Sequence, residues 1–422
     1  MVEKLAVDGG PRAVPDGLTK VPWPLITDED VAAVSAALKS GQIWGNAPNV
    51  ISLEKEWADY CGTKYCHGTN GGTAALHMAL AGAGVGAGDE VIVPAYSFHS
   101  SASCILHHNA IPVFADIDFA TYTLDPKKIE EKITKKTKAI IGVDLFGLPA
   151  NWDGINKIAK KNGLVTIEDG CQAHGAAIRA KKTGALGDIA GFSLNGSKNL
   201  PGAEGGLLTT NDKDLFDKSK ILEMAVQIID GKRTYPAYSF GWNYRMNELS
   251  AALTRSRLKH LDALNGKRRQ NSEYLSSKLK KFDGIIPPYV PEGYTHVYHM
   301  YKIALDPALS EKYKVHIKEI RNGIVFALNA EGVQTALWVQ ETLNHQGIYT
   351  ALRGYGDGCP WTCPYGSRVK RDYANEVYPS AQRLVDSTFN IEFFYPPNEK
   401  PYLDAVIHAF EKVWKNLDML FS

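Results

Sequence analysis

Short apolar runs alternate with helical patterns between about residues 31 and 265, and this alternation is the feature that most limits the possible folds. Each run is short and mainly apolar, as expected of a strand that is buried on both faces. The six runs span residues 91–94, 111–117, 138–146, 164–169, 189–194 and 205–210, and the helical patterns include residues 73–84, 125–133 and 152–163. Strands and helices in this order predict an α/β fold, with a mostly parallel central sheet covered by helices on both faces.

The two ends of the chain do not follow this alternation. Near the start, Gly9-Gly10-Pro11 and Val21-Pro22-Trp23-Pro24 interrupt regular structure. After a long helical pattern at residues 246–264, the chain combines helical patterns with one strand. These later elements are residues 267–280, 299–306, 315–332 and 400–417. We expect an N-terminal arm (1–30), a large domain (31–265) and a smaller C-terminal α+β domain (266–422).

The charge and the cysteine content of the chain argue against several classes of protein. The 47 lysine and arginine residues are balanced by 46 aspartate and glutamate residues, so a net charge of +1 offers little attraction to nucleic acid or a membrane surface. We find no basic-then-apolar leader and no apolar stretch near the roughly 18 residues of a transmembrane helix. Six cysteines in 422 residues suit a reducing compartment. We expect a cytoplasmic protein without nucleic-acid or membrane partners.

Lys198 lies in a glycine-rich segment that directly follows the apolar run of residues 189–194. A lysine among glycines also fits a surface turn. At the end of a buried strand, however, it can point into the edge of the sheet where α/β proteins place their chemistry. Burial lowers the pKa of a lysine, and a neutral amine can attack a carbonyl and hold an imine. Lys198 is therefore the candidate catalytic residue.

Two other segments near predicted strand ends supply groups for a phosphorylated heteroaromatic cofactor. The glycine-rich turn at residues 68–76 leads into a helix, whose N-terminal N–H groups favour an anion, so Gly72 and Thr73 are phosphate candidates. The run ending at Glu168 and Asp169 places two carboxylates at a strand end, of which one needs to face the pocket. Asp169 can pair with a pyridinium nitrogen, although it also suits a helix N-cap.

An aromatic pair and a polar segment complete the set of candidates. Tyr96 or Phe98, just after the run at residues 91–94, can stack on a flat ring. Asn243 and Arg245 precede the long helical pattern, where they are offered to an anion or cap the helix.

Five segments, in this order, resemble the DegT/DnrJ/StrS family. They are GTNGGTAAL (68–76), PAYSF (94–98), EDGCQAHGA (168–176), FSLNGSKNLPGAEGG (192–206) and GWNYRMNELSAAL (241–253). The family consists of fold-type I aminotransferases that use pyridoxal 5'-phosphate (PLP) and act on keto-sugars and keto-cyclitols. The likeness covers about residues 1–265 and is weaker beyond.

The resemblance implies a role for each matching residue. Lys198 matches the lysine that holds PLP as an imine and moves the proton during transfer. Asn243 matches an asparagine that reaches the phosphate of the neighbouring subunit, which implies a homodimer with shared active sites. The other implied cofactor-binding residues are Asp169 at the pyridine nitrogen, Gln172 at the ring hydroxyl, Phe98 on the ring face, and Gly72, Thr73 and Ser193 at the phosphate.

The implied activity is transfer of an amino group from L-glutamate or L-glutamine to a keto-sugar or keto-cyclitol, in aminosugar or aminocyclitol biosynthesis. A histidine replaces the lysine in the related dehydratases, so Lys198 argues against them. Two alternatives stay open: an aminoshikimate-type synthase (as for 3-amino-5-hydroxybenzoate), and a non-catalytic sensor that keeps the fold. The cyclitol branch carries paired late histidines where this chain has residues 390–394, so the ketone is not fixed.

We expect no metal site. The histidine pairs 107/108 and 296/299 share no carboxylate or cysteine at ligand spacing, and Cys61, Cys66, Cys359 and Cys363 do not form a zinc pattern. His174, beside the expected cofactor face, is a candidate on the substrate side.

Overall fold

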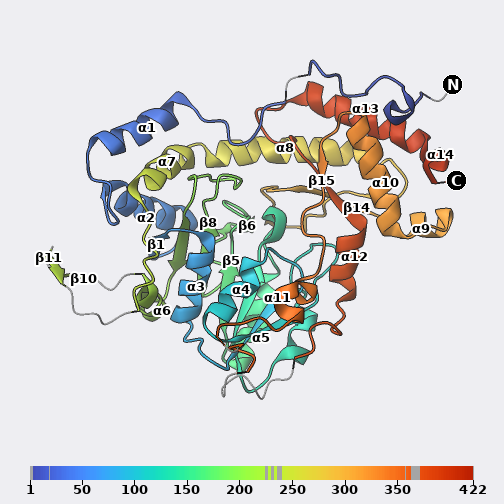
Figure 1. Ribbon diagram of the computed structural model, residues 1–422. Helices are drawn as coiled ribbons and strands as arrows, with labels where there is room; N and C mark the ends of the chain where they lie inside the picture. The colour runs from blue at the N-terminus through green and yellow to red at the C-terminus, as the bar shows by residue number, and fades with distance from the viewer. Residues whose placement is uncertain are drawn as a thin grey trace.

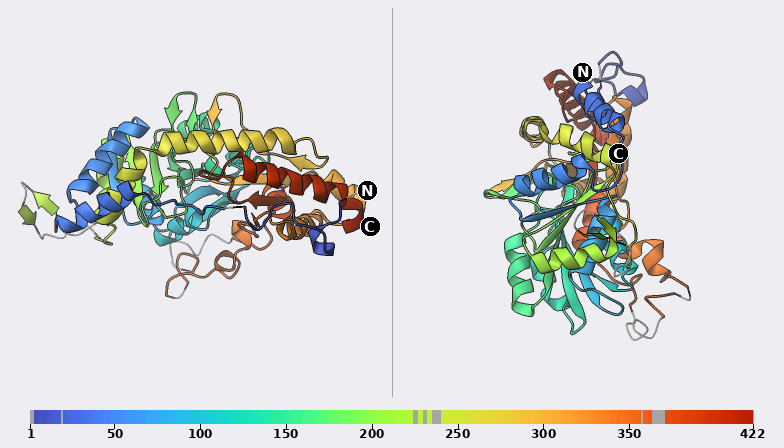
Figure 2. Two further views of the ribbon diagram at one scale, coloured as in Figure 1. Left: turned by 90° about the horizontal axis from the view of Figure 1, so that it is seen from above. Right: turned by 90° about the vertical axis from the view of Figure 1, so that its left-hand side faces the viewer.

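A computed structural model describes residues 3–18, 20–223, 227–229, 232–234, 240–356, 358–362 and 371–421. A large α/β unit and a smaller unit stand side by side, and the long helix α8 (Leu261–Leu279) spans the two (Figure 1). Both chain ends lie on the smaller unit, as the views in Figure 2 also show. Within the described part of the chain, we find no helix long and apolar enough to cross a membrane.

The large unit is built on a seven-stranded sheet in the order β1-β9-β8-β5-β4-β2-β3. Its strands are β1 (Tyr65–Thr69), β2 (Glu90–Pro94), β3 (Ile111–Ala115), β4 (Thr137–Val143), β5 (Val165–Asp169), β8 (Ile189–Ser193) and β9 (Gly206–Thr210). Neighbours from β3 to β8 are parallel, whereas β9 is antiparallel to β8 and β1. The predicted α/β class and mostly parallel sheet are confirmed. The edge strand β1 was not predicted, because Tyr-Cys-His-Gly-Thr is not an apolar run.

The strands are buried on both faces, which explains their continuous apolar sequences. Along β2, Val91 and Val93 pack in one core with α3 (Gly72–Gly82) and α4 (Ser100–His107), while Ile92 packs in another with α5 (Trp152–Asn162). Helices therefore cover both faces. Strand register places Asp169 opposite both Val143 and Gly191, so the carboxyl ends of β4, β5 and β8 lie at one edge.

The smaller unit contains a four-stranded antiparallel sheet in the order β12-β14-β16-β15. Its strands are β12 (Ile285–Ile286), β14 (Tyr301–Leu305), β15 (Thr335–Ala336) and β16 (Thr388–Ile391). The core of this unit also contains Leu5 and Val14 of the arm, whereas Tyr349 and Tyr373 pack into the core of the large unit. The chain thus crosses between the two cores more than once, and the domain limits at residues 30 and 265 stay predictions.

The remaining helices pack around the two sheets, and the remaining strands are short. The helices are α1 (Asp28–Lys39), α2 (Pro48–Cys61), α6 (Lys213–Ser219), α7 (Glu248–Leu258), α9 (Ala308–Tyr313), α10 (Ile317–Ala330), α11 (Gly347–Thr350), α12 (Pro379–Ser387), α13 (Lys400–Lys415) and α14 (Leu417–Phe421). The short strands are β6 (Ala177–Ile178), β7 (Lys181–Lys182), β10 (Gln227–Ile229), β11 (Lys232–Thr234) and β13 (Tyr294–Thr295).

Two helical predictions are wrong in detail. Residues 125–133 form two single 3₁₀ turns, Pro126–Lys128 and Glu130–Lys132, because Asp125 caps the first turn and Ile133 returns to extended backbone. The pattern at residues 246–264 divides into α7 and α8. Buried residues lie all around α7, whereas α8 buries a single stripe with spacings of three and four, so the two helices pack on different surfaces.

Candidate active site

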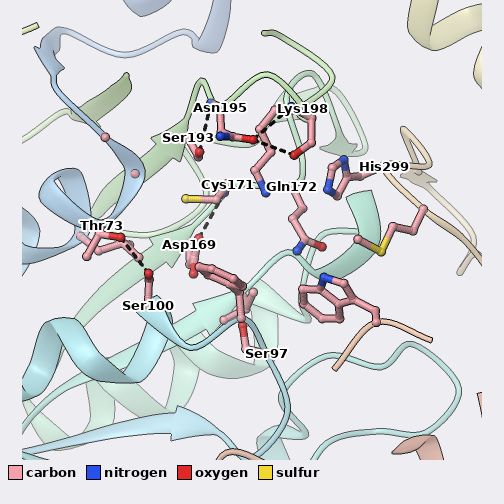
Figure 3. A pocket seen from close by; sticks show the side chains of 18 of the residues that line it. Thr73, Ser97, Ser100, Asp169, Cys171, Gln172, Ser193, Asn195, Lys198 and His299 are labelled. Atoms are coloured by element: carbon pink, nitrogen blue, oxygen red, sulfur yellow. Dashed lines mark hydrogen bonds between the residues drawn. The ribbon is translucent and has the colours of Figure 1, made fainter. Parts of the chain in front are cut away.

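A cavity of about 370 Å³ lies at the carboxyl edge of the central sheet, between the two units. Figure 3 shows polar side chains from several elements converging on it. Of the predicted site residues, Gly72, Thr73, Phe98, Asp169, Gln172, Ser193 and Lys198 line this cavity. Residues that lie far apart in the sequence therefore share one pocket.

Lys198 is presented by the loop that joins β8 to β9. Its backbone N–H donates to Asn195 O at 2.9 Å, and the loop packs closely on α7, where a Cβ on Gly202 would lie 2.2 Å from Thr254 Oγ1. The side chain points from this loop into the cavity (Figure 3). Burial lowers the pKa of Lys198, and the neighbouring Cys171 and Asp169 oppose this only in part. The amine is thus biased toward its neutral, nucleophilic form.

Asp169 ends β5 inside the cavity and is only 4% exposed. Ser101 Oγ donates to its Oδ2 at 2.6 Å, and the Cys171 backbone N–H donates to its Oδ1 at 3.2 Å. Residues 170–176 form turns, so Asp169 does not cap a helix. The carboxylate is held in place and keeps acceptor capacity toward the cavity.

The preceding carboxylate, Glu168, lies on the opposite face of the strand. It is fully buried and accepts backbone N–H groups of Gly184 at 2.6 Å, Leu186 at 2.9 Å and Gly187 at 3.0 Å. As expected, one of the two carboxylates faces the cavity.

Gln172 follows on the same turn and is nearly buried. Phe146 N–H donates to the Gln172 Oε1 at 2.8 Å, which leaves the Gln172 amide nitrogen as a hydrogen-bond donor.

Only one of the two aromatic candidates lines the cavity. Phe98 does so and is 55% exposed, whereas Tyr96 is buried and its hydroxyl donates to Val339 O at 3.1 Å.

The N-terminus of α3 forms the other end of the cavity. Its N-cap, Gly71, has no side chain with which to cap the first turn. Thr73 Oγ1 donates to Ser100 Oγ at 2.7 Å, and Ser193 Oγ accepts from Asn195 N–H at 3.3 Å. A Cβ on Gly72 would lie 2.7 Å from Ser193 Cβ, so glycine is needed for these two elements to approach. The result is a cradle of backbone N–H and hydroxyl groups suited to an anion.

Asn243 is not among the residues that line the cavity. It is exposed, and its backbone oxygen accepts from Asn70 Nδ2 at 3.4 Å. Neither Asn243 nor Arg245 is the cap of α7, because Asn247 Oδ1 accepts the Ser250 N–H at 2.9 Å.

Three residues of the smaller unit that sequence reasoning did not place in the site also line the cavity: His299, Met300 and Trp338. His299 Nδ1 is buried and has no hydrogen-bond partner among the described residues, and burial lowers the pKa of His299 well below its usual value. Its ring faces the same space as Lys198 and Gln172 (Figure 3). In the sequence it is one of the histidine pair 296/299, at which we expect no metal site.

His174, the predicted substrate-side candidate, is fully buried and is not in the lining. Its ring packs between Trp57 and Phe192, with centroid distances of 5.8 and 5.4 Å, and burial lowers its pKa to about 3. The expectation that Cys359 and Cys363 form no zinc pattern stays a prediction, because Cys363 lies outside the described residues.

Comparison with known proteins accords with this fold. Residues 24–369 match the DegT/DnrJ/EryC1/StrS aminotransferase family. The chain is 39% identical to GDP-perosamine synthase of Caulobacter vibrioides over 64% of this chain and 73% of that protein. It is 36% identical to L-glutamine:2-deoxy-scyllo-inosose aminotransferase of Streptomyces lividus over 72% and 75%. The solved structure of 3-amino-5-hydroxybenzoic acid synthase superposes with a TM-score of 0.82 at 26% identity, covering 94% of this chain and 99% of that one.

The fold is that of the type I aminotransferases, and the protein is an aminotransferase. The chain belongs to the DegT/DnrJ/EryC1/StrS aminotransferase family, whose members depend on PLP. The residues of the cavity fit this cofactor. An uncapped helix start for a phosphate, a buried carboxylate for a pyridine nitrogen and a lysine of lowered pKa are present together.

Proposed function

We propose that this chain uses PLP to transfer an amino group from L-glutamate or L-glutamine to a keto-sugar or keto-cyclitol. The observation that carries the proposal is the convergence in one cavity of Lys198, Asp169 and the N-terminus of α3. The names of the two relatives agree with this proposal, because one refers to perosamine and the other to an inosose. They also differ in acceptor, so we propose the class of ketone rather than one compound.

Each side chain would take a part in holding the cofactor. The α3 N-terminus, Thr73 and Ser193 would bind the phosphate, because they form the anion cradle. Asp169 would pair with the ring nitrogen, Gln172 would donate to the ring hydroxyl, and Phe98 would cover one face of the ring. When bound, PLP supplies an electron sink for the carbon that loses its proton.

Lys198 would carry out the proton transfer. It would hold the cofactor until the amino donor arrives, which frees its Nζ. Because burial lowers the pKa of Lys198, the free Nζ can accept a proton from the substrate carbon. It can then deliver this proton to the cofactor carbon that is bonded to the same nitrogen. His299, whose ring is neutral at physiological pH, would offer a hydrogen bond to the substrate from the part of the cavity that the smaller unit lines.

We further propose that the protein works as a homodimer with shared sites, in which Asn243 reaches the phosphate bound by its partner. Asn243 is exposed and lies outside the cavity of its own chain. Next to it, Phe240 and Trp242 are 75% and 47% exposed, and Trp44 is 50% exposed. An Asn243→Ala variant should retain the dimer mass in sedimentation yet bind PLP more weakly. A monomeric wild-type protein of full activity would contradict this part of the proposal.

A dehydrating synthase of the 3-amino-5-hydroxybenzoate type is the second candidate, favoured by the superposition of that enzyme over nearly the whole chain. Both candidates need Lys198. They differ in whether an amino acid donates the nitrogen.

The test is the absorbance spectrum of the purified PLP-loaded protein, before and after addition of L-glutamate or L-glutamine. We expect a lysine-bound cofactor band at the edge of the visible range, which the donor bleaches as the amino group moves to the cofactor. Lys198→Ala should lack both the band and the bleaching. A band that no amino acid changes would favour the synthase or a sensor, and a wild-type protein that binds no PLP would overturn the proposal.

A further inference from the structure

The N-terminal arm reaches the candidate catalytic loop through one side chain. Trp23 Nε1 donates a hydrogen bond to the backbone oxygen of Lys198 at 2.8 Å. The two residues are 175 positions apart in sequence. The bond fixes the peptide unit that follows Lys198, and therefore the direction in which its side chain leaves the loop.

The indole of Trp23 is itself held on several sides. The guanidinium of Arg268, on α8, lies 4.4 Å from the ring centroid, and that of Arg257, on α7, lies 5.2 Å away. Tyr395 packs edge-on with a centroid distance of 6.1 Å. Cation–π contacts of this kind are stronger when the cation is buried, and Arg268 is only 2% exposed.

The backbone of the arm is anchored on either side of Trp23. Before it, Val21 N–H donates to Asn398 Oδ1 and Asn398 Nδ2 donates to Val21 O, both at 2.9 Å. After it, Arg257 Nη1 donates to Leu25 O. The smaller unit and α7 thus fix the segment that carries the indole.

The residue that follows Lys198 is also held. Asn199 is buried, and its Nδ2 donates to Asn265 Oδ1 at 3.0 Å and to Val297 O at 2.9 Å. The peptide unit that follows Lys198 is therefore held twice, by Trp23 at its carbonyl oxygen and through the side chain of Asn199. A lysine has four rotatable side-chain bonds, so a fixed backbone is what narrows the range of positions open to its Nζ.

We propose that Trp23 is a positioning residue, whose hydrogen bond to the Lys198 carbonyl holds Nζ in line for imine formation and proton transfer. The inference rests on the proposed function of Lys198. A displacement of a reacting group by even about 1 Å can lower a rate strongly, so loss of this tether should slow chemistry more than binding.

The decisive variant is Trp23→Phe in the PLP-loaded full-length protein. Phenylalanine keeps an aromatic ring near Arg268 and Tyr395 but lacks the N–H. The matched control is Trp414→Phe. Trp414 lies on α13, away from the cavity, and its indole N–H donates to Asp283 O over the same distance of 2.8 Å. Thermal unfolding compares the stability of the two variants. Incorporating benzothienylalanine at position 23 replaces only the N–H by sulfur and serves if Trp23→Phe fails to fold.

We expect the single-turnover rate constant for donor-driven bleaching to fall about fivefold to tenfold in Trp23→Phe, as for loss of one neutral hydrogen bond. The donor concentration at half-maximal rate should change by less than about twofold, and the pH midpoint of the cofactor band should move by about half a pH unit. Trp414→Phe should behave as wild type in all three. These readouts separate positioning from a general loss of stability.

If Trp23→Phe and the benzothienyl variant match the control in rate and pH midpoint, Trp23 is merely structural and the inference is overturned. If wild-type protein itself forms no lysine-bound band, the proposed function fails and this inference falls with it. The two failures are distinguished by the wild-type spectrum alone.

Discussion

Glu168 and Asp169 are adjacent carboxylates on β5 and both are buried, but their hydrogen-bond partners differ. Glu168 accepts three backbone N–H groups, from Gly184, Leu186 and Gly187. Asp169 accepts one hydroxyl and one longer N–H bond, and its side chain lines the cavity. Because adjacent strand residues face opposite sides, one carboxylate stabilises the sheet and the other is available to a ligand. A buried charge saturated by the backbone is structural, whereas one left partly unsatisfied in a cavity suggests chemistry.

A third buried carboxylate, Asp144, lies outside the lining of the cavity and close to Glu168. Its Oδ1 accepts Ala150 N–H and Trp152 Nε1–H, each at 2.8 Å. Its Oδ2 has no hydrogen-bond partner among the described residues. Burial first, and then the charge of Glu168, raise the pKa of Asp144 well above its usual value. Burial and the neighbouring Glu168 therefore both favour the protonated form of Asp144.

Of the variants that test this comparison, Asp169→Asn should have the largest effect, and the effect should be on turnover. The amide can still accept from Ser101, but it cannot stabilise a positive charge on the ring nitrogen. We expect turnover to fall about 10²- to 10³-fold, as for removal of one electrostatic contact in an active site. The thermal midpoint should stay close to that of wild type. Steady-state kinetics with an amino donor and a panel of ketones measure the turnover. An unchanged turnover would remove Asp169 from the proposed site.

Glu168→Gln should show the opposite pattern. The glutamine side chain would place its NH₂ group against a backbone N–H that now donates to the Glu168 carboxylate. Two hydrogen-bond donors would then face each other. The expected loss is about 2–4 kcal/mol in the free energy of unfolding. Denaturant titration measures it, with Asp169→Asn as the control. At temperatures where the variant is folded, its cofactor band should form normally; a stable variant that cannot form the band would reverse the two roles.

Asp144→Asn should have the smallest effect, and one that depends on pH. A carboxyl whose pKa is raised by folding favours the folded state in its protonated form, so its contribution to stability is lost as the pH rises above its unfolded pKa. Asparagine carries its donor permanently. The variant should lie within about 1 kcal/mol of wild type near pH 5 and be at least as stable at pH 8. Greater instability at pH 8 than at pH 5, relative to wild type, would show that Asp144 is ionised.

Much of the fold could be predicted because buried parallel strands leave continuous apolar runs in the sequence. The runs at β2, β3, β4, β5, β8 and β9 were all recognised, and the register of these strands explains why Asp169, Ser193 and Lys198 meet. What escaped prediction depends on tertiary contacts. The edge strand β1 carries polar residues, and α7 and α8 separate only because each packs on a different surface.

The site divides in the same way. The large-unit residues follow strands or begin a helix, so local sequence pointed to them. His299, Met300 and Trp338 are brought to the cavity by the packing of the smaller unit, which no local pattern records. The bond from Trp23 to Lys198 is likewise set by the path of the arm across α8. Asn243 stays a prediction for the partner subunit.

The most direct test of the central claim is to locate the cofactor on the chain. Borohydride treatment of the PLP-loaded protein makes a lysine–cofactor linkage permanent, and peptide mass analysis then identifies the residue. We predict one pyridoxyl group, on the peptide that contains Lys198, and its loss after prior incubation with the amino donor. A modification on another lysine, or none in a protein that has bound PLP, would contradict the account.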